Sequence, residues 1–134
     1  MTPDAAAFAM EAHKGQLYGE VPYWHHLCNV AKYSWVDNII VWRVAFLHDT
    51  LEDTDVTYAQ LKDNFGLFIA DTVQLLTKDP QLTYFENIQA IIDSGNWVAI
   101  HVKTADNIAN YKHSGKDSLK PRYEKSIRML MGTL

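Results

Sequence analysis

The chain has 134 residues, of which 48% are hydrophobic and 21% charged, a composition typical of one globular domain and not of a disordered chain. Lys and Arg total 12 and Asp and Glu total 16, so the formal net charge is −4, which argues against nucleic acid as the main partner. The single cysteine, Cys28, excludes an internal disulfide, and the longest apolar stretch, residues 39–47, is too short to span a membrane. We therefore expect residues 1–134 to form a single cytoplasmic domain that contacts neither nucleic acid nor a membrane.

The sequence predicts an all-α fold. No alternation of polar and apolar residues typical of strands persists, whereas helix-start and helix-stop residues recur along the chain. Thr2 and Pro3 are typical of an N-cap and a first helical position, and they predict a helix that runs towards Gln16. Gly15 and Gly19 then indicate a loop.

About seven more helices are expected in a compact bundle. They run from Pro22 to about Trp35, from Asp37 or Asn38 to about Asp53, from Thr57 to before Gly66, on to about Thr77, from about Tyr84 to Ser94, from about Trp97 to Lys112, and after Pro121. The third predicted helix is apolar nearly all round, so we expect it to be buried at the centre.

Ionisable side chains follow directly on the apolar part of this third helix. His48, Asp49, Glu52 and Asp53 come after the apolar run 44–47. On a continuous helix, residues four apart share a face, so His48 would lie one turn from Glu52 and Asp49 one turn from Asp53. Carboxylates clustered at the edge of an apolar core need a compensating cation, because uncompensated buried charge is costly. Taken alone, the segment also fits a solvent-facing acidic helix end.

Two other segments supply residues that could complete a site. His25 and His26 lie on the second predicted helix, while Asp106 and Asn110 continue an apolar helical face that includes Val102. Two histidines and two carboxylates form a mixed nitrogen and oxygen donor set, which suits a first-row divalent ion such as Mn²⁺, Fe²⁺ or Zn²⁺.

Such an ion would make hydrolysis of a phosphate ester or anhydride feasible. It would lower the pKa of bound water and polarise a phosphoryl oxygen. Glu52 and Asp53 would then be spare carboxylates, free to position or deprotonate the attacking water. The residues are therefore compatible with metal-assisted hydrolysis of a phosphate ester or anhydride.

The motifs appear in the order found in the HD-domain hydrolases of the stringent response. The chain resembles the single-domain RelA/SpoT-type (p)ppGpp hydrolases over about residues 5–115. Its His-Asp, Glu-Asp-Thr and Lys-x-x-Asp-x-x-x-Asn elements are specific when taken together. The matching segments are residues 12–16, 22–27, 47–54, 65–66, 77–78 and 103–110.

The resemblance implies an HD-domain helical bundle and a catalytic site. In the family, a metal ion, usually Mn²⁺ although another divalent metal would also suit, is held by four side chains that fall here on His26, His48, Asp49 and Asp106. The same resemblance places Glu52 and Asp53 at the catalytic water and Asn110 at the nucleotide. The family reaction removes the 3′-diphosphate of ppGpp as pyrophosphate and leaves GDP.

The segment between Gln16 and Pro22 departs from the family pattern. The family usually has a longer basic loop there, with an Arg that stacks on guanine and a following Lys, whereas residues 17–21 contain no cation. Tyr18 could supply a stacking face instead, and Lys103 could contact a phosphate.

We therefore expect a guanosine-3′,5′-bis(diphosphate) 3′-pyrophosphohydrolase. The alternatives are a nucleotidase or (d)NTP phosphohydrolase of the HD superfamily and a non-catalytic nucleotide-binding sensor. Small helical domains of this kind often self-associate, so a homo-oligomer is a further expectation.

Overall fold

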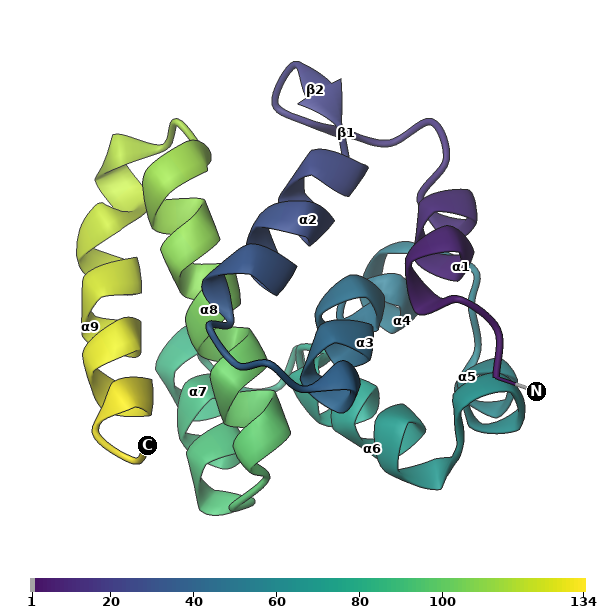
Figure 1. Ribbon diagram of the computed structural model, residues 1–134. Coiled ribbons are helices and arrows are strands. Elements are labelled where there is room, and N and C mark those ends of the chain that lie inside the picture. The colour runs from purple at the N-terminus through teal and green to yellow at the C-terminus, as the bar shows by residue number, and fades with distance from the viewer. Residues whose placement is uncertain (1) are drawn as a thin grey trace.

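The computed structural model describes residues 2–134, and most of them are helical (Figure 1). This part of the chain contains eight α-helices of eight or more residues and one of four residues. Their bounds are α1 Ala5–Ala12, α2 Trp24–Tyr33, α3 Ile39–Leu47, α4 Thr50–Asp53, α5 Tyr58–Phe65, α6 Leu67–Leu76, α7 Tyr84–Asp93, α8 Trp97–His113 and α9 Lys120–Met131. A 3₁₀ turn, η1, spans Asp117–Leu119. The prediction of an all-α bundle is confirmed.

Helix α3 lies at the centre of the bundle, as its apolar sequence predicts. It packs against α1, α2, α6 and α8 (Figure 1). Val41, Val44 and Leu47 are fully buried, and each contributes about 1.5–3 kcal/mol through removal of its side chain from water. Ile39 and Trp42 remain exposed on the outer side of the helix. The core is therefore built around the helix that leads directly to His48.

The start of the first helix differs from the prediction. Asp4, and not Thr2, is the N-cap of α1, because its Oδ1 accepts hydrogen bonds from the backbone N–H groups of Ala6 and Ala7 at 2.9 and 3.2 Å. The helix ends at Ala12 and does not reach Gln16. An aspartate side chain at this position is short enough to turn back onto the first helical turn.

A small hairpin takes the place of the predicted start of the second helix. Strands β1 (Leu17–Tyr18) and β2 (Val21–Pro22) pair antiparallel, and Gly19 adopts a φ of +61° in the turn between them. Pro22 therefore belongs to a strand, and α2 begins at Trp24. In Figure 1 the hairpin lies beyond the N-terminal end of α2. A strand of two residues is too short to show the alternation of polar and apolar residues by which strands are predicted.

The third predicted helix is interrupted at His48 and Asp49. Helix α3 ends at Leu47 and α4 begins at Thr50. The His48 Nδ1–H donates to the Ala45 carbonyl and the Thr50 hydroxyl donates to the Leu47 carbonyl, each at 2.7 Å. These side chains hydrogen-bond to backbone carbonyls at the end of α3, which favours a turn there. The expectation that residues 48–53 share one continuous helix is wrong.

The remaining helix boundaries follow the prediction closely. Thr57 and Thr83 each form a capping box, with Gln60 and Glu86 as their respective partners. Helix α9 begins at Lys120, one residue before Pro121. None of the helices in residues 2–134 combines the length and the apolar character that crossing a bilayer requires.

Candidate metal centre

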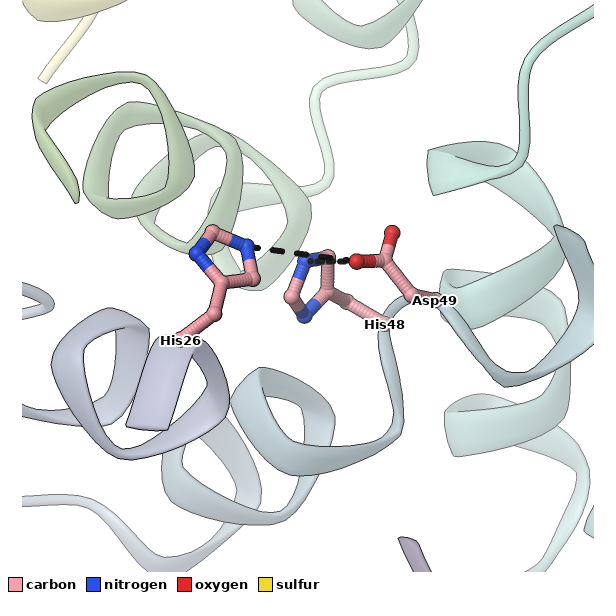
Figure 2. A group of neighbouring side chains, drawn as sticks. All are labelled: His26, His48 and Asp49. Carbon is pink, nitrogen blue, oxygen red and sulfur yellow. Dashed lines mark ion pairs between the residues drawn. The ribbon is translucent and has the colours of Figure 1, made fainter. Parts of the chain in front are cut away.

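Two histidines and two aspartates from distant segments meet at one point in the bundle. His26 comes from α2, His48 and Asp49 from the turn between α3 and α4, and Asp106 from α8. Figure 2 shows the rings of His26 and His48 beside the Asp49 carboxylate. The Nε2 atom of His48 lies 3.0 Å from Asp49 Oδ2 and 3.5 Å from Asp106 Oδ1. The Nε2 atom of His26 lies 3.0 Å from Asp106 Oδ1 and 3.9 Å from Asp49 Oδ2.

The hydrogen bond to the end of α3 determines the neutral tautomer of His48. Because its Nδ1–H donates to the Ala45 carbonyl, the neutral ring carries its lone pair on Nε2. This Nε2 is buried and makes no hydrogen bond within residues 2–134. A buried nitrogen lone pair that faces carboxylates is unfavourable unless a cation or a proton lies between them. The His/Asp cluster could therefore bind a metal ion.

The electrostatics of the cluster favour positive charge at this point. Burial alone would lower the pKa of His48, but the Asp49 and Asp106 carboxylates raise it well above its ordinary value. Burial would raise the pKa of Asp106, but the ammonium of Lys103 and the hydrogen bond with His26 hold it well below its ordinary value. A divalent cation in place of the His48 proton would satisfy the same carboxylates.

Glu52 and Asp53 lie on the exposed side of the cluster. One oxygen from each of them and one from Asp49 lie within 4.8 Å of one another. Burial and the charges of Asp49 and Glu52 raise the pKa of Asp53 to about 6. Glu52 Oε1 accepts a hydrogen bond from the backbone N–H of Lys78 at 2.7 Å, which fixes its position. Both carboxylates therefore lie where water can reach them beside the cluster.

The three side chains expected to contact substrate form a chain of interactions that ends on Asp106. Lys103 Nζ lies 3.1 Å from Asp106 Oδ2, and Asn110 Nδ2 donates to Asp106 Oδ1 at 3.3 Å. The Tyr18 hydroxyl donates to Asn110 Oδ1 at 2.7 Å. The Tyr18 ring also stacks on the His26 ring, with centroids 4.6 Å apart and planes at 11°. The hairpin thus brings Tyr18 to the wall of the site.

A cavity of about 240 Å³ joins these groups. Eight of the nine residues singled out from the sequence line it, and His48 does not. The eight are Tyr18, His26, Asp49, Glu52, Asp53, Lys103, Asp106 and Asn110.

Three supporting residues near the cluster carried no sequence signal beyond their place in the matched segments. The Tyr23 hydroxyl donates to Asp49 Oδ2, and the His13 ring stacks on Tyr23 with centroids 4.5 Å apart. His13 Nδ1 donates to Gln16 Oε1 at 2.9 Å, and Gln16 Nε2 donates to the Asp53 carbonyl at 2.7 Å. The segment after α1 is thereby connected to both Asp49 and Asp53.

Sequence comparison relates the chain to hydrolases of guanosine tetraphosphate. No protein-family model matches it. It is 32% identical over 115 residues to guanosine-3′,5′-bis(diphosphate) 3′-pyrophosphohydrolase MESH1 of Danio rerio, covering 78% of this chain and 64% of that protein. The identity to the Homo sapiens MESH1 protein is 30% over 119 residues, covering 81% and 66%. The chain thus spans slightly less than two thirds of these relatives.

A bacterial relative agrees with this result, and two solved structures share the fold. The Aquifex aeolicus guanosine-3′,5′-bis(diphosphate) 3′-pyrophosphohydrolase is 36% identical over 120 residues, covering 81% of this chain and 17% of that protein. A metazoan ortholog of SpoT that hydrolyses ppGpp superposes with a TM-score of 0.76 at 23% identity, covering 99% of this chain and 89% of that one. A Listeria monocytogenes protein superposes with a TM-score of 0.62 at 26% identity, covering 82% of each chain.

Proposed function

Because the chain resembles the RelA/SpoT-type (p)ppGpp hydrolases in sequence and in fold, we propose that it is an HD-domain, metal-dependent guanosine-3′,5′-bis(diphosphate) 3′-pyrophosphohydrolase. The observation that carries the proposal is the meeting of His26, His48, Asp49 and Asp106 in one cluster with an unsatisfied buried nitrogen. The proposed reaction adds water to ppGpp, breaks the bond between the ribose 3′ oxygen and phosphorus, and releases GDP and pyrophosphate.

The metal ligands in this proposal are the same four residues. Their two imidazoles and two carboxylates suit Mn²⁺, which the family resemblance favours, and would also accept Fe²⁺ or Zn²⁺. When bound, the ion supplies Lewis acidity, which lowers the pKa of water and offsets the negative charge of the phosphoryl group. Tyr23 and the Ala45 carbonyl hold Asp49 and His48 in orientation through their hydrogen bonds.

The chain's own carboxylates handle the attacking water. Asp53, with its pKa of about 6, is ionised at neutral pH and accepts a proton from that water. Glu52 is fixed by the Lys78 backbone N–H and orients the water with its second oxygen. Lys103 offsets part of the negative charge of Asp106 and of the substrate.

Tyr18 and Asn110 contact the nucleotide in this proposal. Their mutual hydrogen bond and the stacking of Tyr18 on His26 position both side chains at the cavity wall. We further propose that residues 1–134 act as one HD-type phosphohydrolase domain in the cytoplasm, on a small nucleotide and without nucleic acid or membrane, and that copies of the chain self-associate.

A substrate panel tests the proposal. Metal-stripped protein is reloaded with Mn²⁺ and given ppGpp, GTP, dNTPs, nucleoside monophosphates and NADPH, and phosphate and pyrophosphate release are measured. We expect pyrophosphate and GDP from ppGpp. Release from another nucleotide alone would instead identify an HD-superfamily nucleotidase or (d)NTP phosphohydrolase. Binding without any release would identify a sensor and contradict the proposal.

A further inference from the structure

A second cavity adjoins the candidate metal centre between α6, α7, α8 and α9. Its volume is about 250 Å³. Its walls share Glu52, Leu76, Tyr84 and Lys103 with the cavity of the metal centre. The two cavities therefore adjoin at these four side chains.

The two cavities differ in charge. The metal-centre cavity is lined by four carboxylates and a single cationic residue besides its histidine. The second cavity is lined by three cationic residues, Lys78, Lys103 and Arg122, and by a single carboxylate, Glu52. Lys103 is paired with Asp106, whereas Lys78 and Arg122 form no ion pair within residues 2–134. The second cavity is therefore suited to an anionic group.

Arg122 is held in place on the cavity wall. Its guanidinium carbon lies 4.7 Å from the centroid of the Tyr84 ring. The Tyr84 hydroxyl donates to Asn107 Oδ1 at 2.6 Å, and Asn107 Nδ2 donates to the Lys103 carbonyl at 2.9 Å. A planar guanidinium that is already oriented binds a phosphate through two parallel hydrogen bonds with little loss of side-chain freedom.

The apolar side chains of the second cavity would strengthen the attraction between Arg122 and a phosphate group. Leu75, Leu76, Ile88 and Ile91 contribute aliphatic side chains to its lining. An apolar wall excludes water on one side, and charges in such surroundings attract each other more strongly than in bulk water. The backbone of Lys78 is fixed in turn, because its N–H is bonded to Glu52.

We propose that Lys78, Lys103 and Arg122 bind a second phosphate group of the substrate, the one that is not hydrolysed. The inference rests on the proposed function, which places the reacting phosphorus at the His/Asp cluster. These three cationic side chains favour nucleotides that carry phosphate groups at two separate positions of the ribose. One such nucleotide is ppGpp, which carries a 5′-diphosphate besides its 3′-diphosphate. The cations that residues 17–21 lack are supplied instead from the segment after α6 and from α8 and α9.

GDP binding tests this cavity independently of turnover. The affinity of Mn²⁺-reloaded protein for GDP is measured by calorimetry for the wild type, Lys78→Glu, Arg122→Glu and Arg122→Lys. Lys125→Glu is the matched control, because Lys125 lies on the same helix and stacks on Phe85 at 4.2 Å but does not line the cavity.

We expect Lys78→Glu and Arg122→Glu to weaken GDP binding about ten- to a hundredfold, the range for hydrogen bonds to charged groups. Arg122→Lys should recover part of the loss, and Lys125→Glu should bind GDP like the wild type. In turnover, the KM for ppGpp should rise in both charge-reversal variants by more than kcat falls. Unchanged GDP affinity in Arg122→Glu and Lys78→Glu would overturn the inference.

The same variants separate this inference from the proposed function. If GDP binding depends on Arg122 and Lys78 but ppGpp is not hydrolysed, the anion site is supported and the proposed function fails. If ppGpp is hydrolysed and the charge reversals leave GDP affinity and KM unchanged, the proposed function is supported and the anion site is overturned.

Discussion

Asp49 is the residue on which the contacts of the candidate metal centre converge. Its carboxylate accepts the Tyr23 hydroxyl and lies within 3.9 Å of the Nε2 atoms of both His26 and His48. Glu52 lies beside the cluster but is not within 4 Å of either histidine. The two carboxylates therefore predict different consequences when removed.

We expect Asp49→Ala to abolish both metal retention and turnover. Glu52→Gln should retain the metal and lower kcat about a hundredfold, because Glu52 orients the attacking water. Metal content of the purified variants and pyrophosphate release from ppGpp provide the two readouts. Normal turnover without Asp49 would contradict the ligand assignment.

Asp53 gives a prediction about the pH dependence of stability. Its pKa in the folded chain is about 6, above the ordinary value of 3.8, so between these values the folded state holds more protons than the unfolded state. Asp53 therefore makes the free energy of unfolding fall as pH rises from about 4 to 6. Asp53→Asn should raise the Tm of metal-free protein at pH 7 and have less effect at pH 3.5. Equal effects at both pH values would contradict the raised pKa.

At the scale of elements, Gln16 connects the segment after α1 to the end of α4. It accepts a hydrogen bond from His13 and donates one to the Asp53 carbonyl at 2.7 Å. Removal of the Gln16 side chain would release the Asp53 backbone without removing any of the four proposed metal ligands. Small displacements of catalytic groups reduce rates steeply.

We expect Gln16→Ala to lower kcat about tenfold or more and the free energy of unfolding by about 1 kcal/mol, with metal content unchanged. Gln89→Ala is the matched control, because Gln89 donates a similar exposed hydrogen bond to Asp93 on α7, away from the site. Wild-type kcat in Gln16→Ala as well as in Gln89→Ala would contradict this role of Gln16.

Capping residues and glycines in the sequence predicted most of the helices. The break after α3 was missed because side chains there hydrogen-bond to backbone carbonyls. The capping boxes at Thr57 and Thr83 and the glycine before α6 are visible in the sequence and mark true boundaries. The break at His48 and Asp49 depends on side chains that bond to the end of α3, and propensity does not reveal this. The hairpin at residues 17–22 is too short to produce a period-2 pattern.

Some residues of the candidate site could be predicted from the sequence, and others could not. The cluster of His26, His48, Asp49 and Asp106 was expected from motif order, and the structure brings these residues together. Lys78 lies in a matched segment but had no predicted role, and Arg122 was not singled out. The two residues lie on different elements, and only tertiary packing brings them to one cavity. Contacts between distant segments thus set the limit of prediction from the sequence.

At the scale of the whole molecule, the candidate metal centre joins three parts of the chain: α2, the turn after α3, and α8. A ligand that binds only the folded state stabilises it by about 2.7 kcal/mol at a hundred times its Kd. For a domain of this size, that corresponds to a rise in Tm of about 10 °C.

We therefore expect Mn²⁺ to raise the Tm of the stripped wild type by about this amount and to raise that of His26→Ala much less. Thermal unfolding with and without a chelator provides the measurement. An equal rise in both proteins would show that the ion binds elsewhere.

The most direct test is the identity of the products formed from ppGpp. Stripped protein is incubated with ppGpp before and after Mn²⁺ is restored, and the nucleotide and phosphate products are separated by anion exchange. We expect no turnover without metal, and equal amounts of GDP and pyrophosphate once Mn²⁺ is restored. Turnover in the presence of chelator, or no release of pyrophosphate from ppGpp by the reloaded protein, would contradict the proposed function.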